Sequence, residues 1–173
     1  MSAADDRLFE AIPPGRSLLI DTSVVLAYLS GTEPSSELAR QVFDACAATG
    51  RNATTLSTVT VAEMLVRPFR RGEPAVATTE GFLRHFAEMR IIDVSYPIAR
   101  QAAGLRALTD LPMPDALIIA TAAVERIDIV ITNDHAWTRA GPALEDLDVV
   151  ILVDLITSPI RRTRFPHAAR SRP

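Results

Sequence analysis

Four acidic residues stand in otherwise apolar stretches of the chain, at positions where strands or helices are expected to begin or end. They are Asp21 in LLIDTSVVLAYL, Glu63 in STVTVAEML, Asp115 in LPMPDALIIATA and Asp134 in VITNDHAW. A lone ionised carboxylate is costly to bury, so each of these acids needs a compensating positive charge. A divalent cation supplies that charge, and the chemistry that such a site serves is metal-dependent hydrolysis of a phosphodiester.

Taken singly, three of the acids have a structural explanation. Asp21 can cap a helix that begins near Val24, and Asp115 can favour the dipole of a helix that it opens. Asp134 can stabilise a turn. Glu63 is the hardest to explain in this way, because its neighbours in VAEMLV indicate a helix face near the core.

The joint occurrence of the four acids is more informative than any one of them. Two carboxylates about 5–6 Å apart repel each other by roughly 3 kcal/mol at an effective dielectric constant near 20. Four such groups, fully ionised and uncompensated, would cost on the order of the whole folding stability. The site must therefore hold protons or metal ions, and Mg²⁺, or Mn²⁺ in its place, is the cation that an all-oxygen donor set favours.

The composition excludes several other phosphate-binding sites. The chain of 173 residues contains no lysine, so its 18 basic residues are all arginine. A P-loop and a phosphoacceptor receiver site both require a lysine, and the seven glycines never fall in the G-x-G-x-x-G spacing of a dinucleotide site.

No apolar run approaches the roughly 20 residues of a membrane helix, and the start MSAADDRLFEAIPPGR has no apolar core of a secretory signal. The expected location is therefore cytoplasmic, with no membrane contact. The single cysteine, Cys46, is expected to be a small buried core residue.

The hydrophobic pattern predicts one α/β domain over residues 17–154. Residues 1–16 are expected to be a loosely attached N-terminal segment, and residues 155–173 an Arg- and Pro-rich flexible tail. Strands are predicted at 17–21, 54–57, 91–94, 129–132 and 149–153, and helices at 24–29, 35–49, 59–66, 75–89, 97–109 and from 115 through ALIIATAAVE.

Pro68 is expected to end the helix at 59–66, with RPFRRGEP as an exposed loop or the tip of a helical hairpin. A short turn and helix is expected at 135–147. Alternation of short β-branched strands with helices indicates a parallel sheet covered on both faces, with ligands beyond the carboxyl ends of its strands.

The segments IDTSVVLAYL, STVTVAEML, MPDALIIATA and VITNDHAW resemble, in order and separation, the motif blocks of the PIN-domain nucleases. The resemblance covers about residues 17–154, and the DTSVVLAYL start is most similar to VapC-type toxins of type II toxin–antitoxin pairs. It implies a five-stranded parallel sheet of order 3-2-1-4-5, Mg²⁺-dependent endoribonuclease activity, homodimers and inhibition by a small cognate antitoxin.

Carried onto this sequence, the family pattern makes Asp21, Glu63, Asp115 and Asp134 the acidic metal site. Asp21 and Asp115 are expected to bind metal directly, Asp134 directly or through water, and Glu63 to hold a water and help deprotonate it.

Side chains beside the acids are expected to support them. The candidates for orienting the carboxylates by hydrogen bonds are Thr22, Ser23, Thr132 and Asn133. The candidates for RNA contact are Arg67, Arg70, Arg71, His135 and Trp137, the last two by stacking on a base. A capping His135, a packed Trp137 and a solvated arginine turn are the structural alternatives.

The net charge of −3 is unusual for a protein that binds RNA, but it becomes +1 when the four site acids are set aside. Residues 158–173, SPIRRTRFPHAARSRP, carry five arginines, and they are expected to be disordered or to contact nucleic acid or a partner.

Three other functions compete with the toxin. A haloacid-dehalogenase-like phosphatase needs a second Asp two residues after the first, where this chain has Ser23, and it also needs a lysine. A non-catalytic PIN-like module that binds RNA or protein typically loses one or more of the acids. A housekeeping PIN nuclease that processes RNA stays open, because the same site serves both roles.

Overall fold

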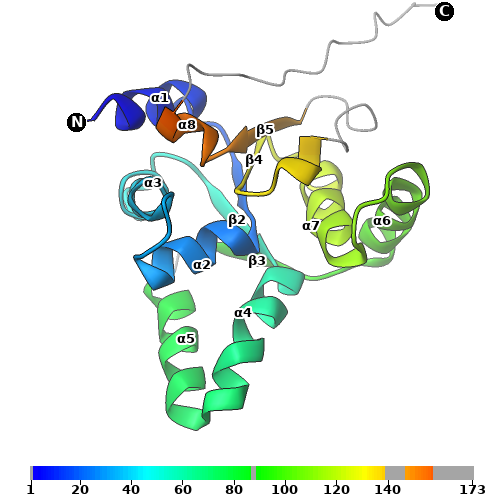
Figure 1. Cartoon of the computed structure of the whole chain (residues 1–173). Helices are drawn as coiled ribbons and strands as arrows, with labels where there is room; N and C mark the ends of the chain where they lie inside the picture. The colour runs from blue at the N-terminus through cyan, green and yellow to red at the C-terminus, as the bar shows by residue number, and fades with distance from the viewer. Residues whose placement is uncertain (1, 87–88, 139–146, 158–173) are drawn as a thin grey trace, which may run out of the picture.

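The computed structural model describes residues 2–86, 89–138 and 147–157, and its centre is a five-stranded parallel sheet (Figure 1). The strands are β1 (Leu18–Ile20), β2 (Thr54–Ser57), β3 (Arg90–Ile92), β4 (Ile129–Thr132) and β5 (Asp148–Ile151). Their order is β3-β2-β1-β4-β5, and every neighbouring pair is parallel. The predicted fold class and strand order are confirmed.

Alternating side chains of the central strands feed two separate cores, one on each face of the sheet. Leu18 and Ile20 of β1 belong to the core shared with α1 to α3, whereas Leu19 between them belongs to the core shared with α6 and α7. This is the period of two that a strand imposes on its side chains. Because both faces of the sheet are buried, β1 and β4 consist almost entirely of apolar residues.

Helices cover both faces of the sheet, and Figure 1 shows α6 and α7 together on one side of it. The helical elements are α1 (Ala3–Ala11), α2 (Thr22–Ser30), α3 (Ser36–Gln41), the π-helical segment η1 (Val42–Ala47), α4 (Thr58–Arg71), α5 (Glu73–His85), α6 (Tyr96–Leu108), α7 (Met113–Val124) and α8 (Asp154–Thr157). None of the helices described is long and apolar enough to cross a membrane.

The predicted loose attachment of the N-terminal segment is wrong, because α1 packs into the core. Leu8 and Ile12 are fully buried, and a capping box between Ser2 and Asp5 begins the helix. The Arg7 guanidinium donates to the carbonyls of Leu155 at 2.7 Å and Ile156 at 3.0 Å, which ties α1 to α8. The periodicity of a single short helix could not show this long-range contact.

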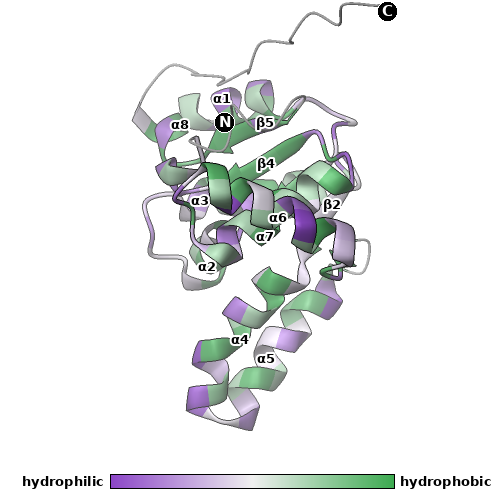
Figure 2. Cartoon of the chain, turned by 90° about the vertical axis from the view of Figure 1, so that its right-hand side faces the viewer, coloured by the Kyte–Doolittle hydropathy of each residue, from purple (hydrophilic) through white to green (hydrophobic). Residues whose placement is uncertain are grey.

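The prediction that Pro68 ends its helix is also wrong. Helix α4 continues through Pro68 to Arg71, and Gly72, at φ +99°, reverses the chain into α5. The two helices form the hairpin that projects from the body of the molecule in Figures 1 and 2. Packing against α5 offsets the hydrogen bond that a proline removes from a helix interior.

The helix predicted at 35–49 is divided into α3 and the π-helical η1. Cys46 lies in η1 and is fully buried, as expected. Residues 139–146, within the predicted turn and helix at 135–147, and the Arg-rich residues 158–173 lie outside the described residues.

Candidate functional site

The four acids come from the carboxyl edge of the sheet and from helices that follow or face it. Asp21 directly follows β1, and Asp134 lies two residues after β4, the neighbouring parallel strand. Glu63 lies in the second turn of α4, which directly follows β2, and Asp115 lies in the first turn of α7.

Asp21 is held more firmly than the other acids. It caps α2 by accepting hydrogen bonds from the backbone N–H of Thr22 at 2.7 Å and of Ser23 at 3.3 Å. Its Oδ2 also accepts from Ser23 Oγ at 2.6 Å and from Thr132 Oγ1 at 2.8 Å. The side chain is 5% exposed, and burial raises the pKa of its carboxyl above the ordinary value, although these hydrogen bonds partly offset the rise.

Glu63 is connected to Asp21 through the next residue of the chain. Thr22 Oγ1 donates to Glu63 Oε2 at 2.5 Å, and this contact joins α2 to α4. The N-cap of α4 is Ser57, whose Oγ accepts from the N–H of Val59. Ser57 was not among the predicted site residues, but a serine just before an apolar helical run is a capping signal, and here that cap determines where Glu63 is placed.

The loop after β4 is organised around the buried Thr132. Its Oγ1 donates to Asp21 and accepts from the N–H of Asp134 at 3.0 Å, so one hydroxyl connects two of the four acids. Asn133 donates its N–H to Ser23 Oγ at 3.0 Å. Thr22, Ser23 and Thr132 therefore bond acids directly, as the sequence predicts, whereas the hydrogen bonds of Asn133 go to Ser23.

Asp115 shows that the four carboxylates share one electrostatic environment. Burial, and then the negative charges of Asp21, Asp134 and Glu63 in that order, raise the pKa of Asp115 to about 6. The fully buried Trp137 indole lowers this pKa, although its Nε1 forms no hydrogen bond among the described residues. The negative charges near Asp115 therefore make its carboxylate bind a proton or a cation more tightly than an isolated aspartate does.

The donor set suits a hard divalent cation, because it consists of carboxylate oxygens with no sulfur or imidazole among them. Within residues 2–86, 89–138 and 147–157, however, no three acidic, histidine or cysteine side chains lie close enough to ligate one ion as they stand. Coordination would therefore require the less constrained acids to turn toward Asp21. Asp134 is exposed, and among the described residues its side chain accepts a hydrogen bond only from the N–H of Ala136, at 2.8 Å.

The residues predicted to contact RNA differ in their exposure to solvent. Arg67, Arg70 and Arg71 are exposed on the last turns of α4. His135 is also exposed and its Nε2 lies 2.7 Å from Asp154 Oδ1. Stacking of Trp137 on a base is ruled out in this structure, because the ring is fully buried in the core shared with α6 and α7.

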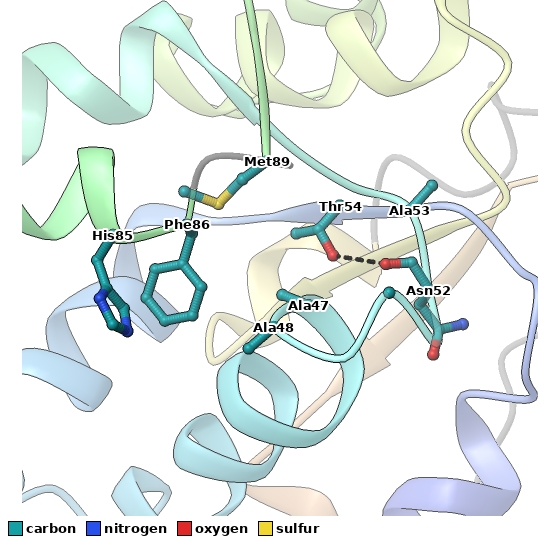
Figure 3. Close-up of a pocket in the computed structure, with 9 residues that line it drawn as sticks. Ala47, Ala48, Asn52, Ala53, Thr54, His85, Phe86 and Met89 are labelled. Atoms are coloured by element: carbon teal, nitrogen blue, oxygen red, sulfur yellow. Dashed lines mark hydrogen bonds between the residues drawn. The ribbon is translucent and has the colours of Figure 1, made fainter.

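A separate cavity of about 570 Å³ lies at the opposite edge of the sheet, where β2 begins (Figure 3). Phe86 and Met89 line one side of it, and Ala47, Ala48 and Thr54 line the other. Among the described residues that line it, His85 is the only one with an ionisable side chain. No acid of the candidate site lines this cavity.

Comparison with known proteins agrees with the topology. Among solved structures, the chain is similar to a toxin–antitoxin complex from Klebsiella pneumoniae, with 24% identity over 70% of this chain and 90% of that chain and a TM-score of 0.54. It is also similar to VapC20 of Mycobacterium tuberculosis, a Sarcin-Ricin loop cleaving toxin, with 19% identity over 66% and 87% and a TM-score of 0.55.

FitAcB from Neisseria gonorrhoeae has 23% identity over 78% of this chain and 97% of that chain, with a TM-score of 0.60. At these identities the likeness shows the fold alone. No curated protein matches the chain. The PIN-domain family model matches residues 18–141, and the chain therefore belongs to the PIN-domain family.

Proposed function

We propose that the chain is a Mg²⁺-dependent endoribonuclease, with Mn²⁺ as a substitute cation, and that it is the toxin of a VapBC-type toxin–antitoxin pair. The observation that carries the nuclease is the electrostatic coupling of Asp115 to all three other acids. That coupling supports a shared site for four carboxylates from elements far apart in the sequence, in a chain with no lysine to neutralise them.

The role of each acidic side chain would depend on how firmly the structure holds it. Asp21, fixed by four donors, and Asp115, made basic by its neighbours, would hold the cation, with Asp134 beside them. The cation would activate a water and neutralise charge on the phosphate. Glu63, positioned by Thr22, would accept the proton of the attacking water.

Arginines near the site would orient the RNA. Arg67, Arg70 and Arg71 are exposed on the same helix as Glu63, and their guanidinium groups suit phosphate oxygens. His135 is a second candidate, because it is exposed and is adjacent to Asp134. These contacts would direct a strand toward the carboxyl edge of the sheet.

The cleavage assay compares the parent protein with Asp21→Asn and with Asp6→Asn as matched control. Asp6 is an exposed aspartate of α1, so its change to Asn removes one charge outside the site. The parent and Asp6→Asn should cleave RNA with Mg²⁺ or Mn²⁺ and stop in EDTA, whereas Asp21→Asn should be inactive yet folded. Cleavage by Asp21→Asn at the parental rate would overturn the assigned site.

The second part of the proposal is that this nuclease acts as a toxin. It is supported by the solved relatives, which include toxin–antitoxin complexes, and it implies a small antitoxin partner and a homodimer. Induced expression should arrest growth, and co-expression of the neighbouring antitoxin gene should relieve the arrest. Harmless expression of an enzyme that is active in vitro would instead support a housekeeping RNA-processing nuclease.

A further inference from the structure

The cavity of about 570 Å³ at the start of β2 has walls from three separate parts of the fold. They are the end of η1 with the turn that follows it, the residues that lead into β2, and the end of α5 with the residue before β3 (Figure 3). Its volume lies in the range of about 300–1,000 Å³ that small-molecule sites occupy. Because protein interiors are otherwise closely packed, a hollow of this size is a candidate ligand site.

One wall of the cavity consists of residues with little or no side chain. They are Ala47, Ala48, Gly50 and Ala53. Ala47 is the last residue of the π-helical η1, and the N–H of Ala48 bonds the carbonyl of Phe43 at 2.8 Å. π-Helical turns are rare and occur frequently at functional sites. An uncommon backbone conformation therefore presents the small side chains that leave this space open.

The facing wall is apolar and firmly held. Phe86 is 5% exposed, and its ring centroid lies 6.1 Å from that of Tyr28 and 5.3 Å from those of Phe43 and Phe82. Met89 is also buried, and its thioether is of a kind that makes favourable contacts with aromatic rings. Since three other rings hold Phe86 in place, a flat ring that enters the cavity would meet a preformed apolar surface.

His85 gives the cavity an unused hydrogen-bonding group. Its ring lies edge to face with that of Phe86 at 5.0 Å, and among the described residues it forms no hydrogen bond or ion pair. The amide of Asn52, by contrast, already donates to two backbone carbonyls at 2.8 Å, and the Thr54 hydroxyl donates to the carbonyl of Asn52 (Figure 3). No carboxylate or guanidinium group is found among the described lining residues, so the cavity suits an uncharged ligand.

The cavity has a buried floor and an exposed rim. Phe86 and Met89 are buried, whereas Ala48, Ala53 and His85 are exposed. A ligand can therefore enter from solvent, bury its ring against the floor and keep its polar group beside His85 at the rim.

We propose that this cavity binds a small, uncharged and flat aromatic molecule, whose ring packs against Phe86 and Met89 and whose one polar group forms a hydrogen bond with His85. The proposal does not depend on the proposed nuclease function, because none of the four acids lines the cavity. A flat ring is favoured over a flexible aliphatic chain, because it loses little conformational entropy on binding and adds a ring contact to Phe86.

Indole is the probe, because it is flat and uncharged and has one N–H group. The full chain is labelled with ¹³C at the methyl groups of its four methionines, Met1, Met64, Met89 and Met113. Met89 lines the cavity, and Met64 and Met113 do not. The ring current of bound indole should shift the Met89 methyl signal, which Met89→Leu assigns, with a Kd of about 1 mM or lower. The signals of Met64 and Met113 should stay in place.

Two variants test the space and the hydrogen bond. Ala53→Leu fills the cavity from its rim and should weaken indole binding about tenfold or more. Its matched control is Ala77→Leu, at an exposed alanine of α5 outside the cavity, which should bind indole as the parent does. His85→Phe keeps the ring but removes its polar atoms, and it should weaken indole binding about 2- to 10-fold. Indene, which has a CH₂ in place of the N–H, should bind the parent and His85→Phe equally.

Parental positions of the Met64 and Met113 signals would show that each variant is folded, and Ala48→Leu replaces Ala53→Leu if the latter does not fold. Three outcomes would overturn the proposal. They are no shift of the Met89 signal at about ten times the expected Kd, equal indole binding by the parent and the folded cavity-filling variant, and equal indole binding by the parent and His85→Phe.

Discussion

At the scale of single residues, Asp21 combines two roles that appeared to be alternatives in the sequence. It caps α2, and the same cap fixes its carboxylate at the end of β1. Thr132 extends this arrangement to β4 by bonding both Asp21 and the backbone of Asp134. A carboxylate held by four donors loses little freedom on binding a cation, so the capping geometry itself prepares the site.

Thr132→Val tests that arrangement with a side chain of nearly the same shape. Two hydrogen bonds of the buried hydroxyl disappear, so the free energy of unfolding should fall by about 1–3 kcal/mol and Mg²⁺ affinity by about 10–100-fold. Thr60→Val is the control, because Thr60 is equally buried and its hydroxyl has no hydrogen-bond partner in the part of the chain that the structure describes. Urea unfolding and metal titration measure both effects. Equal losses in the two variants would contradict the role of Thr132.

Asp115→Asn tests the charge repulsion within the site. The pKa of Asp115 is about 6 in the fold and 3.8 as the ordinary value, so the fold binds the proton more tightly than the unfolded chain does. Its contribution to stability is therefore fully present below about pH 4 and is lost as the pH rises through about 6.

Removing this carboxyl should accordingly stabilise the metal-free protein at pH 7.5, and much less at pH 4.5. Unfolding in EDTA at the two pH values measures the difference. Adding Mg²⁺ should then stabilise the parent more than the variant, because the parent keeps all four carboxylates. A variant no more stable than the parent at pH 7.5 in EDTA would show that the repulsion is absent.

At the scale of elements, the sequence predicts the α4–α5 hairpin only in part: RPFRRGEP does form the tip of a helical hairpin, but Pro68 does not end its helix. Helix α4 carries Glu63 near its start and the exposed arginines near its end, with Pro68 between them. A proline inside a helical pattern predicts a helix end, because it lacks the N–H donor and clashes with the preceding turn. The helix continues because packing of α4 against α5 stabilises it by more than the proline destabilises it.

Pro68→Ala should therefore stabilise the protein by about 1–3 kcal/mol, because it restores a helical N–H and removes a clash. Pro74→Ala is the matched control. Pro74 lies in the first turn of α5, where proline is compatible with a helix, and its loss should be neutral or cost up to about 1 kcal/mol. Denaturant midpoints would measure both variants, and a destabilised Pro68→Ala would show that the helix depends on the proline.

Other elements show what the sequence could and could not predict. Strands β2 and β4 were predicted with their exact bounds, since short β-branched runs between turn residues have no competing pattern. The packing of α1, the π-helical turn around Cys46 and the burial of Trp137 could not be predicted. Each depends on contacts with residues distant in the sequence, which periodicity within one segment does not contain.

At the scale of the whole molecule, the sheet order brings β1 and β4 side by side. Asp21 and Asp134, which are more than a hundred residues apart in the sequence, therefore follow two neighbouring strands. The membership of the chain in the PIN-domain family and its likeness to toxin structures agree with that topology. The charge of the molecule is unevenly distributed, with an acidic body and a basic segment at residues 158–173.

The most direct test of the central claim, that the four acids form one cation site, is a Mn²⁺ titration followed by electron paramagnetic resonance, which counts the free ion. The parent and Asp6→Asn should bind Mn²⁺, Mg²⁺ should compete with it, and Asp21→Asn should bind it at least about tenfold more weakly. Equal Mn²⁺ binding by the parent and Asp21→Asn would contradict the account.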